Sequence, residues 1–303
     1  MNGKELRTVA RATVSEFGKD DVGYMAAALT YYAFFSLFPL LLLSITLAGV
    51  FFKPEDAERF IILNVAQVAP GSVQLLQSTL DEALKNRNNA GFLAFVSVVT
   101  LIFTASGAFD ALDKSLNRAW NSEKVPSLIA GKITSFIMML VIGALLILSV
   151  LISTLLTTTK NLTVSFTGDN RGSQFFWYVA NSAGSLCIVF LGILLLYRLV
   201  PRREIVVRDV WRAALGAGIL WEAAKEAFAL FLGSSFANYS AVYGTLGTVI
   251  ALLTWIYVSS IIILTGAEFA AETARVRRLR NNVAGVNQSS DKSQGRRSPW
   301  FAG

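Results

Sequence analysis

The stretch that decides the fold is Val22–Phe52, which reads VGYMAAALTYYAFFSLFPLLLLSITLAGVFF and contains no charged residue. A bilayer has a hydrocarbon core about 30 Å thick, which about 20 apolar residues of α-helix can cross. The stretch exceeds that length, so it predicts a transmembrane helix. It is also longer than the roughly 7–15 apolar residues of a signal peptide, so we expect it to stay in the mature protein.

Five further stretches repeat this pattern along the chain. Residues 90–109, 133–159 and 172–197 contain no charged residue, 244–267 is uncharged, and 211–233 is largely apolar but carries several charges. We therefore predict an all-α fold, a polytopic membrane helical bundle whose helices span about residues 24–52, 90–109, 133–158, 174–198, 211–233 and 244–268. The composition agrees, because 54% of the residues are hydrophobic and 16% are charged, against about 25% charged in soluble domains.

The lysines and arginines predict the orientation of this bundle. Six crossings place both ends of the chain on one side of the membrane. The segments on that side (1–21, 110–132, 198–212 and 272–303) hold 20 lysines and arginines, whereas the segments on the other side hold six. Because basic residues accumulate in cytoplasmic loops, we expect the N- and C-termini to be cytoplasmic.

Three segments outside the spans carry apolar residues at helical spacing. They are residues 1–21 with Leu6, Val9, Thr13 and Phe17, the loop after the second span with Leu112, Leu116 and Trp120, and the outer segment 53–89 with Val73, Leu76, Leu80 and Leu84. The first predicts a cytoplasmic amphipathic helix on the inner leaflet, before a membrane domain at 22–272. Support of the bundle is the simpler role for all three. Residues 273–303 are basic, then small and polar, and predict a disordered cytoplasmic tail.

The residue types that are missing exclude several kinds of chemistry. The chain has no histidine and one cysteine, Cys187, so a tetrahedral zinc site and an intramolecular disulfide are not expected. No Gly-x-x-x-x-Gly-Lys-Ser/Thr loop occurs, which argues against ATP-driven transport by this chain alone. We expect no cofactor and no metal.

The net charge of +7 has a membrane explanation. The basic residues follow the orientation described above, and their simplest anionic partners are lipid headgroups. A nucleic-acid surface would interleave basic and aromatic residues, and the basic segment 275–280 contains no aromatic residue. We therefore expect membrane lipids, and no nucleic acid, as partners.

The fifth span carries a charged cluster, Glu222, Lys225 and Glu226, about halfway along its length. The spacing i, i+3, i+4 places the three side chains on one helix face. A charge at the bilayer centre costs about 2.5–3.5 kcal/mol, so this face must meet a polar cavity, a partner helix or water. The cluster is either a contact for a polar headgroup or a proton site, or else a self-neutralising group that locks the bundle.

The first span is polar for a membrane helix and contains a proline. Pro39 lacks a backbone donor and its ring conflicts with the carbonyl of Phe35, which predicts a kink or break. Tyr31, Tyr32 and Ser36 place hydroxyl groups nearby. A discontinuous helix that lines a cavity is typical of transporters, but a kink that only shapes packing is an equal alternative.

The sixth span and its entry contain the last candidate residues, Tyr243, Trp255 and Glu268. Trp255 lies in mid-span, where its indole N–H needs a partner. Glu268 lies near the cytoplasmic end, where a carboxylate costs less. Helix packing and anchoring at the interface are the simpler roles for all three.

Four stretches carry a resemblance to a known family. They are Ala28–Pro39, Ser115–Trp120, Val200–Arg203 with Trp221–Lys225, and Tyr243–Gly247 with Trp255 and Gly266–Glu268. In this order they resemble the YihY/BrkB family of bacterial inner-membrane proteins, once labelled ribonuclease BN. The resemblance implies six membrane helices in the bacterial inner membrane, and export or flipping of lipid-linked molecules has been proposed for relatives. It supplies no catalytic residue, and the absence of histidine argues against the ribonuclease label.

These observations favour a transporter or flippase of an amphipathic, anionic, lipid-like molecule rather than an enzyme. Its polar part would meet Lys225 and the hydroxyls of Tyr31, Tyr32 and Ser36, with Glu222 and Glu226 setting the charge of the cavity. The alternatives are a membrane scaffold without transport activity and, last, a membrane-bound ribonuclease. The substrate could be lipid-linked, and a homo-oligomer is compatible with the sequence.

Overall fold

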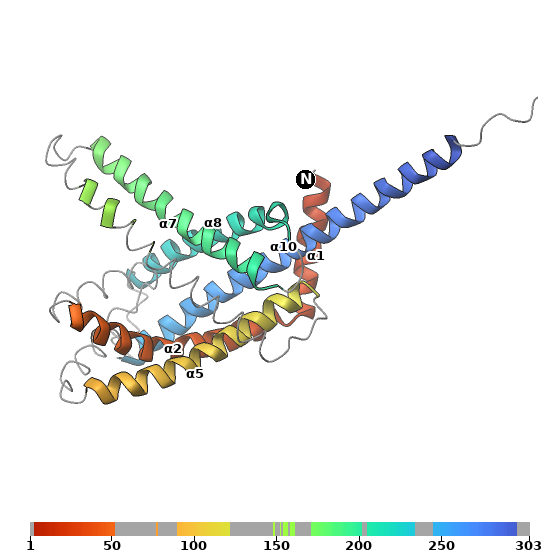
Figure 1. Cartoon of the computed structure of the whole chain (residues 1–303). Coiled ribbons are helices and arrows are strands. Elements are labelled where there is room, and N and C mark those ends of the chain that lie inside the picture. Colours follow the sequence, from red (N-terminus) through yellow and green to blue (C-terminus); the bar gives the residue numbers. More distant parts are fainter. Residues whose placement is uncertain are drawn as a thin grey trace, which may run out of the picture.

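The computed structural model describes residues 3–51, 77, 90–121, 148, 152, 154–156, 158–160, 171–201, 205–233 and 245–295. Every regular element in these ranges is a helix, which confirms the all-α prediction (Figure 1). The long helices are α1 (Gly3–Lys19), α2 (Val22–Phe51), α5 (Ala90–Ala119), α7 (Arg171–Leu199), α8 (Val207–Gly233) and α10 (Thr245–Gly295). The outer segment 53–89, nearly all of the third span and Tyr243 lie outside the described residues.

Two of the described helices are long and apolar enough to cross a bilayer, Gly172–Leu199 in α7 and Leu246–Leu279 in α10. A shorter apolar helix covers Val22–Leu37 in α2. Helices α2, α7 and α8 include most of residues 24–52, 174–198 and 211–233, where spans are predicted, and the crossing of a membrane by α2 and α8 stays a prediction.

Helix α10 lies at the centre of the packing. It contacts α1, α2, α5, α7 and α8, while α2 also contacts α5 and α7 also contacts α8. Small side chains make these close contacts possible, since α8 and α10 bury a series of alanines. The alanines are Ala213, Ala214, Ala217, Ala267, Ala270, Ala271 and Ala274.

Two glycines mark the closest approaches between helices. A Cβ atom on Gly107 of α5 would overlap the ring of Tyr32 of α2, and a Cβ atom on Gly266 of α10 would overlap the hydroxyl of Tyr197 of α7. Tyr197 is fully buried, and its hydroxyl donates a 2.6 Å hydrogen bond to the carbonyl of Ile263. Gly266 therefore makes room for a specific bond between α7 and α10.

Helix α2 continues through Pro39, so a break at this proline is wrong, whereas the alternative of a kink stays a prediction. Proline removes one backbone hydrogen-bond donor, and the remaining hydrogen bonds on both sides can keep a long helix continuous. The Ser36 hydroxyl donates to the carbonyl of Ala33 at 2.8 Å, so its bond lies within its own helical turn.

Two predicted boundaries also need correction. The predicted span 90–109 and the helical segment after it form one helix, α5 (Ala90–Ala119), and Leu116 and Trp120, the residue after its end, are buried in the core. The tail predicted to be disordered from residue 273 is helical as far as Gly295. Residues 245–295 contain no proline, and alanine and arginine, both strong helix formers, recur in the segment 270–280. Figure 1 shows this end of α10 projecting beyond the other helices.

Helix α1 covers one end of the bundle, where it packs against α10. Val9 and Thr13 of its predicted stripe are buried, and Phe17 packs on the core, whereas Leu6 is half exposed. The amphipathic helix is thus confirmed as a helix, and its apolar stripe faces the protein.

Candidate functional site

An ion pair between Glu222 and Lys225 lies on the side of α8 that faces α7. Lys225 Nζ is 2.5 Å from Glu222 Oε2, and both side chains are less than one-fifth exposed. Ser185 of α7 donates a 2.6 Å hydrogen bond to Glu222 Oε1 and lies 3.4 Å from Lys225 Nζ. The two charges and one hydroxyl therefore satisfy one another between two helices.

Aromatic side chains surround this pair and connect it to α10. The ammonium of Lys225 lies 5.5 Å from the ring centroid of Trp221, a cation–π distance. The indole of Trp221 donates to Ser259 Oγ of α10 at 3.1 Å, and its ring lies 5.4 Å from that of Trp255. We call Ser185, Trp221, Glu222, Lys225 and Ser259 the α8 polar cluster.

Glu226 differs from its neighbours in the predicted triplet. It is exposed on α8, and the ion pair that the structure gives Lys225 is with Glu222. The spacing i, i+3 thus identified the pair, and the interhelical partners Ser185 and Ser259 carried no signal in the sequence.

The hydroxyl-bearing side chains that were predicted as candidates on α2 contact residues of α2 and α5. Tyr31 is 59% exposed and its ring contacts Tyr32 at 5.4 Å and Phe35 at 4.8 Å. Tyr32 faces Gly107 of α5, and Ser36 bonds within its own helix. No contact found in the described ranges joins these residues to Lys225, so the structure does not unite the two groups that the sequence singled out.

Trp255, in the last predicted span, lies among the aromatic side chains around the α8 polar cluster. It is 3% exposed, and its ring stacks on that of Phe228 with 5.4 Å between the ring centroids. Glu268 lies three to four turns further along α10. It belongs to a second polar group, at the end of the bundle that α1 covers.

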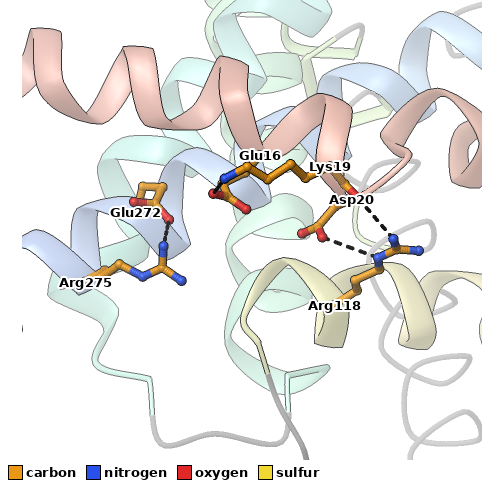
Figure 2. Close-up of polar contacts among 6 residues, drawn as sticks. All are labelled: Glu16, Lys19, Asp20, Arg118, Glu272 and Arg275. Atoms are coloured by element: carbon orange, nitrogen blue, oxygen red, sulfur yellow. Dashed lines mark hydrogen bonds and ion pairs between the residues drawn. The ribbon is translucent and has the colours of Figure 1, made fainter.

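This second group, the α1–α10 carboxyl cluster, combines Glu16, Asp20, Glu268 and Glu272 (Figure 2 shows all of them except Glu268). Basic residues pair with three of the four carboxyl groups. Lys19 lies 2.7 Å from Glu16, Arg118 of α5 lies 3.3 Å from Asp20, and Arg275 lies 2.7 Å from Glu272.

Sequence reasoning selected Glu268 and missed the rest of this cluster. One signal was available, because Glu272 follows Glu268 by four residues and so shares its helix face. Asp20 and Arg118 are 98 residues apart in the chain, and only the packing of the α1–α2 turn against α5 brings them together.

The fold and these sites define a helical membrane protein. The chain belongs to the family described as virulence factor BrkB, whose family model matches residues 13–291. It is 28% identical over 246 residues to YfkH of Bacillus subtilis, which is named as a ribonuclease-like protein, with 81% of this chain and 88% of that protein covered.

Other relatives carry the name UPF0761 membrane protein. The one from Aliivibrio salmonicida is 32% identical, with 82% of this chain and 76% of that protein covered. The one from Alteromonas mediterranea is 27% identical, with 88% and 87% covered. No solved structure matches the chain. The family that the sequence motifs resembled is thereby confirmed.

Proposed function

We propose that this membrane protein is a transporter or flippase of an amphipathic, anionic, lipid-like molecule. In this proposal it crosses the bacterial inner membrane six times, with both termini in the cytoplasm. The observation that carries it is the half-buried Glu222–Lys225 pair within the apolar helix α8. Charges at such a depth cost about 2.5–3.5 kcal/mol each, and in membrane proteins they commonly mark substrate or ion paths.

The α8 polar cluster suggests how a headgroup would bind. A phosphate or carboxylate would compete with Glu222 for the ammonium of Lys225 and would accept a hydrogen bond from Ser185. Trp221 would keep the ammonium in place through its ring face. Glu226, exposed on the same helix, would repel the anion from the outer side of α8. The acyl chains would stay along the apolar surfaces of α7 and α8, and the exposed Tyr31 remains a proposed contact on α2.

Reconstitution into liposomes with a fluorescent anionic phospholipid tests the proposal. We expect Lys225→Ala and Glu222→Gln to reduce scrambling at least about tenfold, which corresponds to about 1.4 kcal/mol of barrier. Lys114→Ala is the matched control, because Lys114 is an exposed lysine of α5 away from the cluster. Equal scrambling by the wild type and both cluster variants would refute transport through this site.

A scaffold without transport activity is the second candidate, and one observation favours it. Both oxygens of Glu222 already have partners, Lys225 and Ser185, so the pair can act as a lock between α7 and α8. In a scaffold, removing one partner of this pair would lower the melting temperature. It would change no transport rate, because the protein would transport nothing. A cysteine at position 222, in a Cys187→Ser background, would react with a water-soluble thiol reagent only if a wet cavity reaches it.

A membrane-bound ribonuclease ranks third. It is motivated by the name of the Bacillus subtilis relative. Nuclease activity that copurifies with the protein and survives the combined loss of Glu222, Glu226 and Glu268 would identify a contaminant.

A further inference from the structure

The α1–α10 carboxyl cluster holds more acidic than basic groups. Its acidic members are Glu16, Asp20, Glu268 and Glu272, and the basic residues paired with them are Lys19, Arg118 and Arg275. Figure 2 shows each of these basic side chains beside an acid other than Glu268, and Arg118 also pairs with the neighbouring Asp21. Among the described residues Glu268 is therefore the acid of this cluster without a basic partner.

Glu268 is also the most deeply buried member of the cluster. It is 2% exposed, and its Oε1 atom makes no hydrogen bond within the part of the chain that the structure describes. The carboxyl group of Asp20 lies next to it, and Glu16 and Glu272 lie close enough to repel a negative charge on it. An ionised Glu268 would thus be a buried, unpaired charge among like charges.

The contact between Asp20 and Glu268 has a chemical requirement. Ionised carboxylates accept hydrogen bonds and cannot donate them, so two of them bond only when one carries a proton. Aspartic-protease sites show the same logic, since two close carboxyl groups do not both ionise.

Among the described residues, the other helices around Glu268 supply no compensating charge. Tyr197 of α7 uses its hydroxyl on the carbonyl of Ile263, and Asp209 of α8 pairs with Arg277 of α10. The Tyr257 hydroxyl of α10 lies against Gly23 of α2. The charges that face Glu268 are thus those of its own cluster.

We propose that the buried Glu268 carries an exchangeable proton, which it donates to Asp20 and which holds the α1–α2 turn against α10. When the proton leaves to water, two carboxylates face each other in a buried position, and the turn and α10 are driven apart. Helix α10 also carries Ser259 and Trp255 beside the α8 polar cluster, so proton release at one end of the helix can act on the other. The proton site stands on contacts outside that cluster and does not depend on the proposed transport.

The test is the pH dependence of thermal stability of the purified full chain in detergent. Wild-type protein should lose several degrees of melting temperature between about pH 6 and about pH 9, because the folded state holds on Glu268 a proton that the unfolded chain has already released, and this difference costs more as the pH rises. Glu268→Gln keeps a donor towards Asp20 at every pH, so its melting temperature should stay level over that range. Infrared difference spectra should show a protonated carboxyl band in the wild type that Glu268→Gln lacks.

Glu272→Gln is the matched control, because Glu272 lies one turn away on the same helix, is also buried, and is paired with Arg275. It should lower stability at every pH and keep the wild-type slope. Asp20→Asn is a second variant that should remove the slope if Glu268→Gln does not fold. A wild-type slope in both Asp20→Asn and Glu268→Gln would overturn the proposal.

A sodium titration separates the proton from a metal ion. If sodium chloride, but not choline chloride, restores stability at about pH 9, the bridging species is sodium and the proton assignment fails. Lipid scrambling by Glu268→Gln reports separately on transport. If the melting temperature of Glu268→Gln does not change with pH and its lipid scrambling equals that of the wild type, the proton site is supported, whatever the effect of Lys225→Ala on scrambling.

Discussion

At the scale of single residues, Gly266 shows how much one missing atom can matter. Its Cα hydrogen faces the hydroxyl of Tyr197, the largest of the fully buried side chains. A glycine is needed here for close approach, not for an unusual backbone angle, since it lies within the regular helix α10. The bond from Tyr197 to the Ile263 carbonyl would be lost if the two helices moved apart.

Gly266→Ala should therefore destabilise the protein by about 1–3 kcal/mol, because the added methyl group overpacks a tight contact. Gly216→Ala in α8 is the control, since nothing lies within 4 Å of its added Cβ atom. It should be neutral or stabilise by up to about 1 kcal/mol, as alanine favours helix. Thermal unfolding in detergent measures both, and equal melting temperatures would show that α7 and α10 can separate at no cost.

Arg118 and Trp120 allow a second comparison at this scale. Arg118 is about half exposed, so its ion pairs with Asp20 and Asp21 should contribute about 0–1 kcal/mol. Trp120 is 4% exposed in the core. Trp120→Ala should cost about 3–5 kcal/mol, several times the effect of Arg118→Ala. Chemical or thermal unfolding of the two variants checks the order, and a larger loss in Arg118→Ala would contradict it.

At the scale of helices, apolar length located helices in the chain. Helices α2, α7 and α8 lie where apolar runs are predicted to span a membrane, and the spans themselves stay predictions. The pattern did not locate the helix end after the second span, because the charges at Asp110, Asp113 and Lys114 separated the predicted span from the predicted helical segment that follows it. They continue α5, while Leu116 and Trp120 keep the inward face apolar. A charged residue can end a membrane span without ending the helix.

The two candidate sites differ in how far sequence could predict them. The Glu222–Lys225 pair lies within one helix, so its spacing alone revealed it. The contacts of Ser185 with Glu222 and of Glu268 with Asp20 join distant parts of the chain. Such contacts depend on which helix faces which, and hydrophobic periodicity does not specify that choice.

Helix α8 offers a test at this scale. Ser185→Ala removes the donor from α7 to Glu222 but leaves the ion pair with Lys225. We expect a loss of about 1–3 kcal/mol, the cost of leaving a partly buried carboxylate without its donor. Ser173→Ala, on the same helix but outside the α8 polar cluster, is a comparison for loss of a serine hydroxyl. Thermal unfolding of both variants is the measurement, and an unchanged melting temperature in Ser185→Ala would mean that the helices do not rely on this bond.

At the scale of the whole molecule, the proposed topology makes a direct prediction. Six crossings with both ends in the cytoplasm require that single cysteines at positions 2 and 300, in a Cys187→Ser background, stay unlabelled by an impermeant reagent in intact cells. A cysteine placed in the loop 160–171 should be labelled. Labelling of one terminus but not the other would require an odd number of crossings.

The 51 residues of α10 have a mechanical consequence for the whole protein. At 1.5 Å per residue the helix is about 77 Å long, more than twice the thickness of a hydrocarbon core. The contact that holds it to α7, the hydrogen bond of Tyr197 near Gly266, lies well before its C-terminal end, so this contact would be the pivot of any rigid tilt of the helix. A tilt of about 10° at this pivot would swing Gly295 through about 8 Å. Small rearrangements around Glu268 or Trp255 are thus amplified at the far end of the helix, where another molecule could detect them.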